Sequence, residues 1–475
     1  MCEGIVAELE GIQLGDERLN RRSKKLIVAL AANPEASINA ACEGWGDTLA
    51  AYRFCDNSSV TPQKILEPHR EATAARMRQQ PVALIVQDTT ELDFSAHPPS
   101  GVECLNKPYR LGLYDHTLLA VTPERLCLGV VGGEQYSRAP DSLGRANERS
   151  TLPIEEKESL RWLTGYRVAC ELARQCPTTS VVSVADREAD IYDIFVEARQ
   201  LKQTAPAGPA AEYIIRARVD RCLTQRDEEA GGATYLKVRE EVAKSPLLGT
   251  REVDLPETPK RPARKAILEI RAQSVLVKPP HARSRLPAVE MQVVSARETG
   301  VPEGETEVSW LLLTSLPVEK LDEALRVVDY YVARWTIEIF FRVLKTGCGV
   351  EKIQLETLAR LQNCLAFYKI IAARILYLTY LNRVTPDIPC TAVFTASEWK
   401  SVWSVVTKEK LPRKPPTLAE FMKLLTELGG YNNRATEAPP GPQAMWIGLR
   451  RMLDFARAWL AFGPESEGAA QVVYK

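Results

Sequence analysis

The sequence predicts an α/β protein whose core of alternating strands and helices is interrupted by an inserted β-strand subdomain and flanked by helical N- and C-terminal domains. Three observations predict this fold class. Apolar runs typical of buried strands alternate with helical stretches between about residues 71 and 384. Short strand-like pieces separated by Pro, Gly and charged turns fill residues 219–308. Helical periodicity dominates residues 1–70 and 385–475.

Length and composition support several ordinary globular domains. A chain of 475 residues exceeds the size at which one hydrophobic core usually stops growing. Hydrophobic residues make up 45% of the chain and charged residues 26%, which argues against a disordered or fibrous protein. The 61 basic residues balance 61 acidic ones, which excludes a strongly basic nucleic-acid binder. Any contact with DNA must therefore come from local clusters.

Cysteines and hydropathy indicate the compartment. The eleven cysteines include no C-x-x-C pair, which is typical of reduced thiols in a cytoplasm. The most apolar segment, Leu365–Leu381, is interrupted by Lys369 and Arg374. We therefore expect a cytoplasmic protein that does not cross a membrane.

The N-terminal region contains an amphipathic helix from Asp16 to Asn33, with a capping-type Asp at its start and Pro34 after its end. Further helices are expected at Asp47–Cys55 and from Thr61 onward. The polar face of the first helix could lie along DNA phosphates or be an ordinary solvated face. Its five cations are Arg18, Arg21, Arg22, Lys24 and Lys25.

Two acidic residues follow strands that read as buried on both faces. Asp88 comes after the apolar run Val82–Val86, and Asp186 comes after Ser180–Ala185. Sheets of α/β proteins present ligand sites beyond the carboxyl ends of their strands, so both acids are candidate functional residues. The alternative for either one alone is that the Asp caps the following helix.

A third acid, Glu338, lies in a helix that follows the insertion. At about 100° per residue, the polar residues of this segment form one stripe about 80° wide, and nearly all of the remaining surface is apolar. Glu338 is the only acid in the stripe, which suits a phosphate-bearing ligand near a metal, although a solvated edge with a Glu–Arg pair would give the same pattern. The members of the stripe are Tyr331, Arg334, Glu338, Arg342 and Lys345.

Three carboxylates without a His or Cys cluster favour a hard cation, Mg²⁺ or Mn²⁺, over zinc. Two such ions about 4 Å apart would support in-line phosphoryl displacement, the chemistry of DNA strand cleavage and strand transfer. Arg334, Arg342 and Lys345 would then neutralise phosphates along the helix.

Several short motifs, in order along the chain, resemble the DDE cut-and-paste DNA transposases of the IS-four type, and in particular the Tn-five branch of that family. The strongest is Y-x2-R-x3-E-x6-K, which is met by Tyr331, Arg334, Glu338 and Lys345. The others are Q-D-T-T at Gln87–Thr90, E-K-E-S at Glu156–Ser159, D-R-E-A-D-I at Asp186–Ile191, R-P-A-R-K-A at Arg261–Ala266 and W-L-L-L-T-S at Trp310–Ser315.

The resemblance implies an RNase H-like catalytic core at 71–384, a DNA-binding domain at 1–70 and a dimerisation domain at 385–475. It also implies that Asp88, Asp186 and Glu338 hold the metal ions. It implies that Tyr331, Arg334 and Lys345 grip DNA near a hairpinned end, with Trp310 receiving a flipped nucleotide. Arg216 resembles a phosphate-contacting arginine of the family, and Arg342 matches a basic position beside the signature. Without the family, Trp310 would be interpreted as a core aromatic at the start of a strand.

The chain departs from the family pattern around Leu113–His116, where a Trp pair is missing, and around the N-terminal L-G-D-x-R pattern at Leu14–Arg18. The same terminal DNA sequence is therefore not expected as its substrate. The resemblance implies a homodimeric DNA transposase that cleaves transposon ends by way of a hairpin and joins them to target DNA, acting in a bacterial cell near the nucleoid. The alternatives are a domesticated non-catalytic DNA-end-binding protein or transposition inhibitor, and a stand-alone nuclease.

Overall fold

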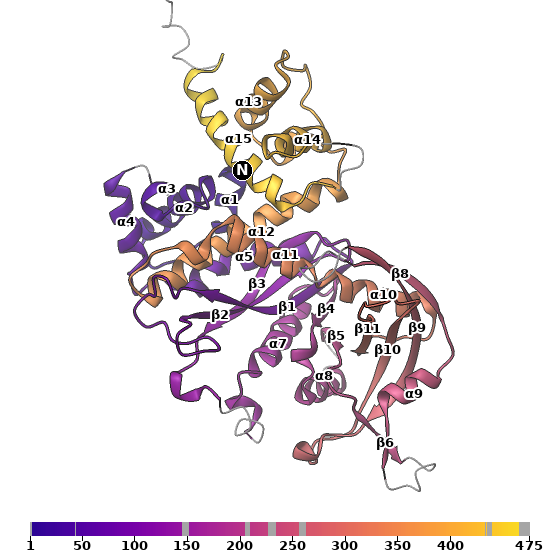
Figure 1. The fold of residues 1–475 in the computed structure, drawn as a ribbon. Helices are drawn as coiled ribbons and strands as arrows, with labels where there is room; N and C mark the ends of the chain where they lie inside the picture. The colour runs from indigo at the N-terminus through magenta and orange to yellow at the C-terminus, as the bar shows by residue number, and fades with distance from the viewer. Residues whose placement is uncertain are drawn as a thin grey trace, which may run out of the picture.

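The computed structural model describes residues 2–42, 44–144, 152–204, 210–226, 234–255, 263–432, 434 and 439–464. A large mixed sheet crosses the molecule, with helices on both faces and helical segments at both ends of the chain (Figure 1). The α/β fold class with helical flanks is therefore confirmed.

The sheet is built around five strands in the order β3-β2-β1-β4-β5. The pairs β1–β4 and β4–β5 are parallel, whereas β2 is antiparallel to both β1 and β3. Their apolar runs are buried because helices cover both faces. The strands are β1 Val82–Asp93, β2 Gly112–Val121, β3 Cys127–Tyr136, β4 Ser180–Ala185 and β5 Glu212–Arg216.

The inserted strands continue this sheet instead of forming a sheet of their own. Strand β11, Ser309–Thr314, lies antiparallel to β5 and also pairs with β10, so the path runs on as β5-β11-β10-β9-β6-β7, with β8 on β9. The other members are β6 Cys222–Arg226, β7 Tyr235–Lys237, β8 Gly249–Leu255, β9 Arg264–Val277 and β10 Val289–Thr299, with helix α9 at Val238–Lys244. Two residues of the R-P-A-R-K-A motif, Arg261 and Pro262, lie outside the described residues.

Helices α7 (Leu160–Gln175) and α8 (Tyr192–Thr204) cover one face of the core strands, and α5 (Pro62–Met77) and α12 (Leu358–Val384) lie on the other (Figure 1). Helix α7 approaches β1 closely at Gly165, where a Cβ would lie 2.2 Å from Oε1 of Gln87. Any larger residue there would require the Gln87 side chain to shift.

Helix α12 is the central helix of the second face. Its 27 residues are long and apolar enough for a membrane span, but 89% of its most apolar window is buried inside the protein. Such burial is typical of a core helix, which is hydrophobic on all sides because protein surrounds it.

The N-terminal region is helical, as expected. Helix α2 is capped by Asp16, whose side chain accepts a hydrogen bond from the amide of Arg18, and α5 is capped by Thr61. Both starts agree with the sequence prediction. The helices that precede α5 in the described residues are α1 Cys2–Val6, η1 Ala7–Leu9, α2 Glu17–Ala32, α3 Ile38–Ala41 and α4 Trp45–Cys55.

A buried polar cluster fastens the N-terminal segment to the core. Glu8 of η1 lies 2.6 Å from Nδ1 of His69, and Arg76 donates to both of its oxygens at 3.0 and 3.1 Å. The amide of Val130 donates to Nε2 of His69, so this ring is neutral and its Nδ1–H donates to Glu8. The cluster joins η1, α5 and β3.

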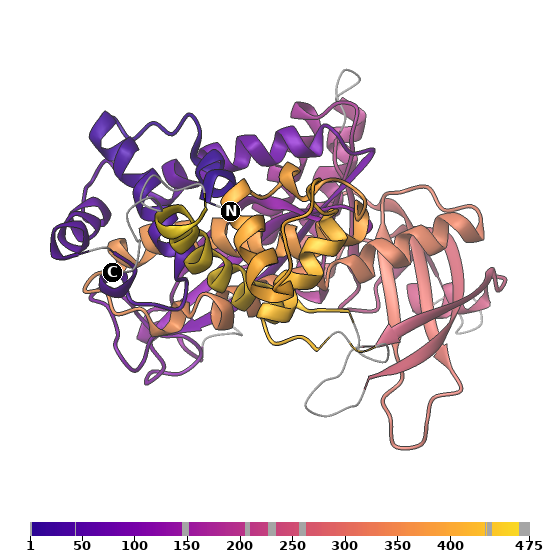
Figure 2. The same ribbon diagram turned by 90° about the horizontal axis from the view of Figure 1, so that it is seen from above.

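Three further helices follow α12 and pack on one another. The first two begin with capping boxes, Thr395 with Glu398 and Thr417 with Glu420. Figure 2 shows these helices over the middle of the molecule, between the N-terminal helices and the inserted strands. They are α13 Ala396–Thr407, α14 Leu418–Leu428 and α15 Pro442–Phe462.

Candidate active site at the carboxyl ends of the central strands

Asp88 lies on β1 at the point where the sheet loses a strand. The parallel pairing of β1 with β4 ends at Gln87 and Ala185, whereas the antiparallel pairing with β2 continues through Asp88, opposite Thr117, to Asp93. The expectation that the strand ends at Asp88 was therefore wrong. Asp88 nevertheless lies beside a gap in the sheet, because the neighbouring strand β4 ends at Ala185 and does not pair with it.

The Asp88 carboxylate is largely buried, with its side chain 25% exposed. Oδ1 accepts a hydrogen bond from the amide of Thr89 at 2.8 Å, and Oδ2 accepts from Nη1 of Arg334 at 2.8 Å. Burial, with a smaller contribution from the charges of Glu338 and Asp186, raises its pKa to about 6, against the opposing effects of Arg334 and the Thr89 amide. The carboxylates of this site therefore interact.

Asp186 directly follows β4 and caps the short helix η4, Arg187–Ala189, by accepting a hydrogen bond from the amide of Arg187. Both sequence interpretations of this residue therefore hold together, since it caps a helix and also lies at the carboxyl end of a parallel strand. It is half-buried.

Arg334 connects the acids. Its side chain is 6% exposed, and Nη1 and Nη2 donate to Asp88 Oδ2 and Glu338 Oε1, each at 2.8 Å. Burial alone would lower its pKa, but Tyr331 and the three carboxylates of Asp88, Glu338 and Asp186 together raise it. One guanidinium thus lies in the field of all three acids. Its buried Nε has no hydrogen-bond partner among the described residues.

The segment that carries Arg334 is not the single helix expected. Helix α10 (Leu321–Ala333) ends just before Arg334, α11 (Thr336–Arg342) follows, and a π-helical turn spans Val343–Gly347. The amides of Arg334, Trp335, Ile337 and Glu338 each bond three residues back, so the chain tightens there, whereas the amide of Cys348 bonds five residues back.

The polar stripe consequently runs from the core to the surface. Tyr331 and Arg334 are buried, Lys345 is half-buried, and Glu338 and Arg342 are exposed. Lys345 lies 3.6 Å from Glu351, whose carboxylate accepts from the amide of Asp93 on β1. An ideal helical wheel could not predict this gradient because it ignores the tightened turn.

An aromatic cluster lies beside Arg334. Trp310, 5% exposed, packs edge-on against Tyr331 at 5.4 Å and against Trp335 at 6.1 Å between ring centroids. Burial raises the pKa of Tyr331, and the nearby cation of Arg216 opposes the rise. The Arg216 side chain also donates to the carbonyl of Ser309 at 3.3 Å. The structure thus places Trp310 in the core, beside the candidate site.

The predicted basic face of α2 is far less free than its composition indicates. Arg18 pairs with Asp16, Arg22 with Asp47 and Lys24 with Glu10. Arg21 and Lys25 are exposed. Three of the five cations are therefore neutralised within the chain.

Sequence reasoning missed a buried polar network behind Asp88. His116 Nδ1 lies 2.9 Å from the hydroxyl of Thr89, and its Nε2 lies 3.3 Å from Oε1 of Gln87. Burial, followed by the cations of Arg161 and Lys369, lowers the pKa of His116 to about 3, so the ring is neutral. The signal available was the E-K-E-S motif, which ends two residues before Arg161.

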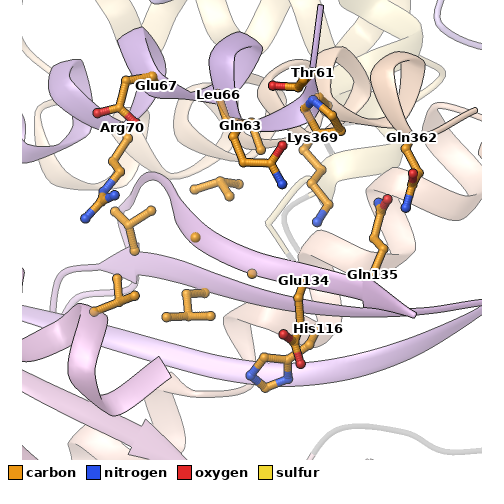
Figure 3. A pocket seen from close by; sticks show the side chains of 18 of the residues that line it. Thr61, Gln63, Leu66, Glu67, Arg70, His116, Glu134, Gln135, Gln362 and Lys369 are labelled. Carbon is orange, nitrogen blue, oxygen red and sulfur yellow. The ribbon is translucent and has the colours of Figure 1, made fainter. Parts of the chain in front are cut away.

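The network borders a cavity of about 570 Å³ between α5, β3, α7 and α12. Figure 3 shows Lys369 extending from its helix toward the strands and His116 on a strand of the opposite wall. Lys369 Nζ lies 2.6 Å from Oδ1 of Asp115, and both side chains are buried. The cavity is separate from the three acids.

No three Asp, Glu, His or Cys side chains within the described part of the chain lie close enough to hold a metal ion as they stand. Asp88 and Glu338 instead share the guanidinium of Arg334. The donor chemistry of three interacting carboxylates still fits a hard divalent cation. Such a cation would take over the charge-compensating position that Arg334 holds here.

Three parts of the chain match models of known domain families. Residues 1–60 match the transposase DNA-binding domain, residues 167–373 the transposase DDE domain, and residues 370–461 the transposase Tn5 dimerisation domain. The DDE match contains Asp186 and Glu338. Asp88 lies before it and joins the site through the pairing of β1 with β4.

Proposed function

The chain belongs to the Tn5-like DDE transposases, because it carries their DNA-binding, DDE and dimerisation domains in one polypeptide, and we propose that it cuts and joins DNA with two Mg²⁺ ions held by Asp88, Asp186 and Glu338. A DNA transposase of this type has an RNase H-like core and works with divalent metal ions. The identity of the ligands and of the metal is the step proposed.

The observation that carries the proposal is the position of Arg334 among three acids from distant parts of the chain. Its guanidinium bonds Asp88 and Glu338, and the charge of Asp186 acts on it as well. Excess carboxylate charge gathered at the carboxyl end of parallel strands is typical of a cation site. The buried Arg compensates that charge in the protein alone.

In the proposed reaction the protein residues position and neutralise. Asp88 enters the reaction ionised, which its burial opposes and a compensating cation favours. The ions would activate the attacking water or 3′-hydroxyl and stabilise the leaving oxygen. Once released from a carboxylate, Arg334 has donor groups free for a phosphate oxygen, for which its planar fork is suited.

The DNA would follow the exposed end of the stripe. Arg342 is exposed and can reach a phosphate as it stands, whereas the half-buried Lys345 would have to compete with Glu351 for one. Tyr331, Arg216 and Trp310 lie together beside Arg334, and the hairpin and flipped-nucleotide roles proposed for this group require the cluster to open, because Trp310 is only 5% exposed.

The proposed substrates are transposon-end DNA and target DNA, handled by a homodimer in the bacterial cytoplasm. The transposase DNA-binding and Tn5 dimerisation matches support both partners. On α2, Arg21 and Lys25 are the exposed cations, and contacts by Arg18 and Arg22 would have to compete with Asp16 and Asp47.

Cleavage by the purified protein tests the metal assignment. The substrate is a DNA duplex that ends in the inverted repeats flanking the gene, incubated with Mg²⁺ or Mn²⁺. We expect Asp88→Ala, Asp186→Ala and Glu338→Ala each to abolish cleavage while still shifting the end DNA on a gel. The matched control is Asp93→Asn, because Asp93 is on the same strand but pairs with Arg110. Cleavage by all three Ala variants would refute the assignment.

Strand transfer separates a transposase reaction from simple hydrolysis. Pre-cleaved ends and a supercoiled plasmid are supplied together, and joined products are expected with the wild-type protein. Hydrolysis without joining would point to a nuclease. End binding without any cleavage would point to a domesticated binding protein or inhibitor.

A further inference from the structure

Arg161 is a buried arginine in the first turn of α7, with its side chain 8% exposed. Its three donor groups reach three different segments. Nε donates to the hydroxyl of Thr89 at 3.2 Å, Nη2 to Glu188 at 2.9 Å and Nη1 to the carbonyl of Glu158 at 2.7 Å. The first two of these segments carry Asp88 and Asp186.

On the β1 side, the connection to Asp88 is one residue long. Thr89 follows Asp88 directly, and its amide donates to Asp88 Oδ1 at 2.8 Å. Holding the Thr89 side chain therefore fixes the backbone group that orients the Asp88 carboxylate. On the β4 side, Glu188 follows Asp186 by two residues on the short helix η4, which Asp186 itself caps.

The hydrogen bonds run in one direction from Arg161. Because its Nε donates to the Thr89 hydroxyl, that hydroxyl is free to donate to His116 Nδ1, and His116 Nε2–H then donates to Gln87 Oε1. The side-chain Nε2 of Gln87 donates in turn to Ser183 Oγ on β4 at 3.0 Å. Every member finds a consistent partner, and the chain of bonds ends on the strand that delivers Asp186.

Packing holds the same groups in place. The His116 ring meets Trp162 edge-on at 4.7 Å between centroids, and the Arg161 guanidinium lies over Tyr136 at 5.5 Å. The Glu188 side chain is 63% exposed, so the pair with Arg161 alone would be weak. What distinguishes Arg161 is that one rigid, buried guanidinium contacts both segments at once.

We propose that Arg161 is a positioning residue that sets the separation and orientation of Asp88 and Asp186 through Thr89 and Glu188, so that the two carboxylates are prearranged for a divalent cation. The inference rests on the proposed metal site. It predicts that loss of Arg161 lowers the affinity for the metal ion while the protein stays folded, because the carboxylates remain but lose their fixed spacing.

The test measures direct binding of Mn²⁺ to the full-length protein. The electron paramagnetic resonance signal reports the concentration of free Mn²⁺, and thermal unfolding is measured in parallel. We expect Arg161→Met to weaken Mn²⁺ binding about tenfold, within the range found for residues that support metal ligands. Arg161→Lys should recover part of the loss. Thr89→Val, which removes only the connecting hydroxyl, should reproduce the weakening and serves if Arg161→Met fails to fold.

Arg167→Met is the matched control. Arg167 is on the same helix and forms a two-pronged pair with Glu197, away from both segments. We expect it to change thermal unfolding without changing Mn²⁺ binding. Wild-type affinity in both Arg161→Met and Thr89→Val, or an equal loss in Arg167→Met, would overturn the positioning role.

The failure of the proposed function gives a different result. If Asp88→Ala binds Mn²⁺ as tightly as the wild type, the metal site itself is wrong and the role of Arg161 falls with it. If Asp88→Ala loses binding and Arg161→Met does not, only the positioning role is wrong.

Discussion

Arg334 and Asp88, 246 positions apart in the chain, are joined by a hydrogen-bonded ion pair of 2.8 Å between Nη1 and Oδ2. A similar bond joins Arg334 to Glu338, one helical turn further on. The first pair is mostly buried, whereas the Glu338 side chain is 55% exposed. The two bonds should therefore differ in energy.

Double-mutant cycles should resolve this difference. We expect a coupling energy of about 2 kcal/mol between Arg334→Met and Asp88→Asn, because a charged hydrogen bond away from water is strong. For Arg334→Met with Glu338→Gln we expect less than about 1 kcal/mol, because solvent screens an exposed pair. Urea unfolding in the presence of a metal chelator measures both. Equal couplings would contradict the role of burial.

The raised pKa of Asp88 should make stability depend on pH. Between its ordinary value of 3.8 and about 6, the folded protein keeps the proton that the unfolded chain has lost. The free energy of unfolding of the wild type should therefore fall, relative to Asp88→Asn, as pH rises through this window, and level off above it. The full difference is at most about 3 kcal/mol. A difference independent of pH would contradict the shift.

Glu8 should show the opposite sign. Its burial would raise its pKa, but His69 and Arg76 lower it from 4.5 to about 2. Its stabilising contribution is complete above about 4.5 and is lost as pH falls toward about 2. We expect Glu8→Gln to lose about 3 kcal/mol at neutral pH and to approach the wild type in acid.

The control for Glu8 is Glu10→Gln, two residues along the chain. The side chain of Glu10 is 79% exposed and pairs only at the surface with Lys24, at 3.3 Å. Chemical unfolding of this variant should match the wild type at every pH. A similar loss in both variants would show that the buried cluster has no special role.

The buried pair of Lys369 and Asp115 gives a prediction of a different kind. Both side chains are at most 5% exposed, and their charged atoms are 2.6 Å apart. Lys369→Met should reduce the free energy of unfolding by roughly 3–5 kcal/mol, because it leaves Asp115 charged and unpaired. The double variant Asp115→Leu with Lys369→Met should recover most of the loss. A loss of unfolding free energy in the double variant equal to the sum of the losses in the two single variants would contradict this.

The sequence predicted the strands that deliver Asp88 and Asp186, because an unbroken apolar run before an abrupt polar boundary depends only on local composition. It misjudged where β1 ends, because the strand continues past Asp88. The gap beside Asp88 exists because the neighbouring strand β4 ends there. Such an ending is a property of a neighbour distant in sequence.

The helix of Glu338 shows the same limit at shorter range. Its polar stripe was evident from spacing, but the break at Arg334 and the π-helical turn at Val343–Gly347 depend on what the backbone packs against. Arg161 was missed although the E-K-E-S motif lies beside it, because the two segments that it contacts are brought together only in the folded chain.

The pairing of β11 with β5 makes the insertion a protective extension of the catalytic sheet. If residues 219–308 were removed, β11 would keep β5 on one side but would lose β10 on the other. Its free amides and carbonyls would then form a naked edge along an apolar strand, a template for aggregation between molecules. By covering this edge, the insertion helps to keep the protein soluble. A chain without it should precipitate even if its active site were intact.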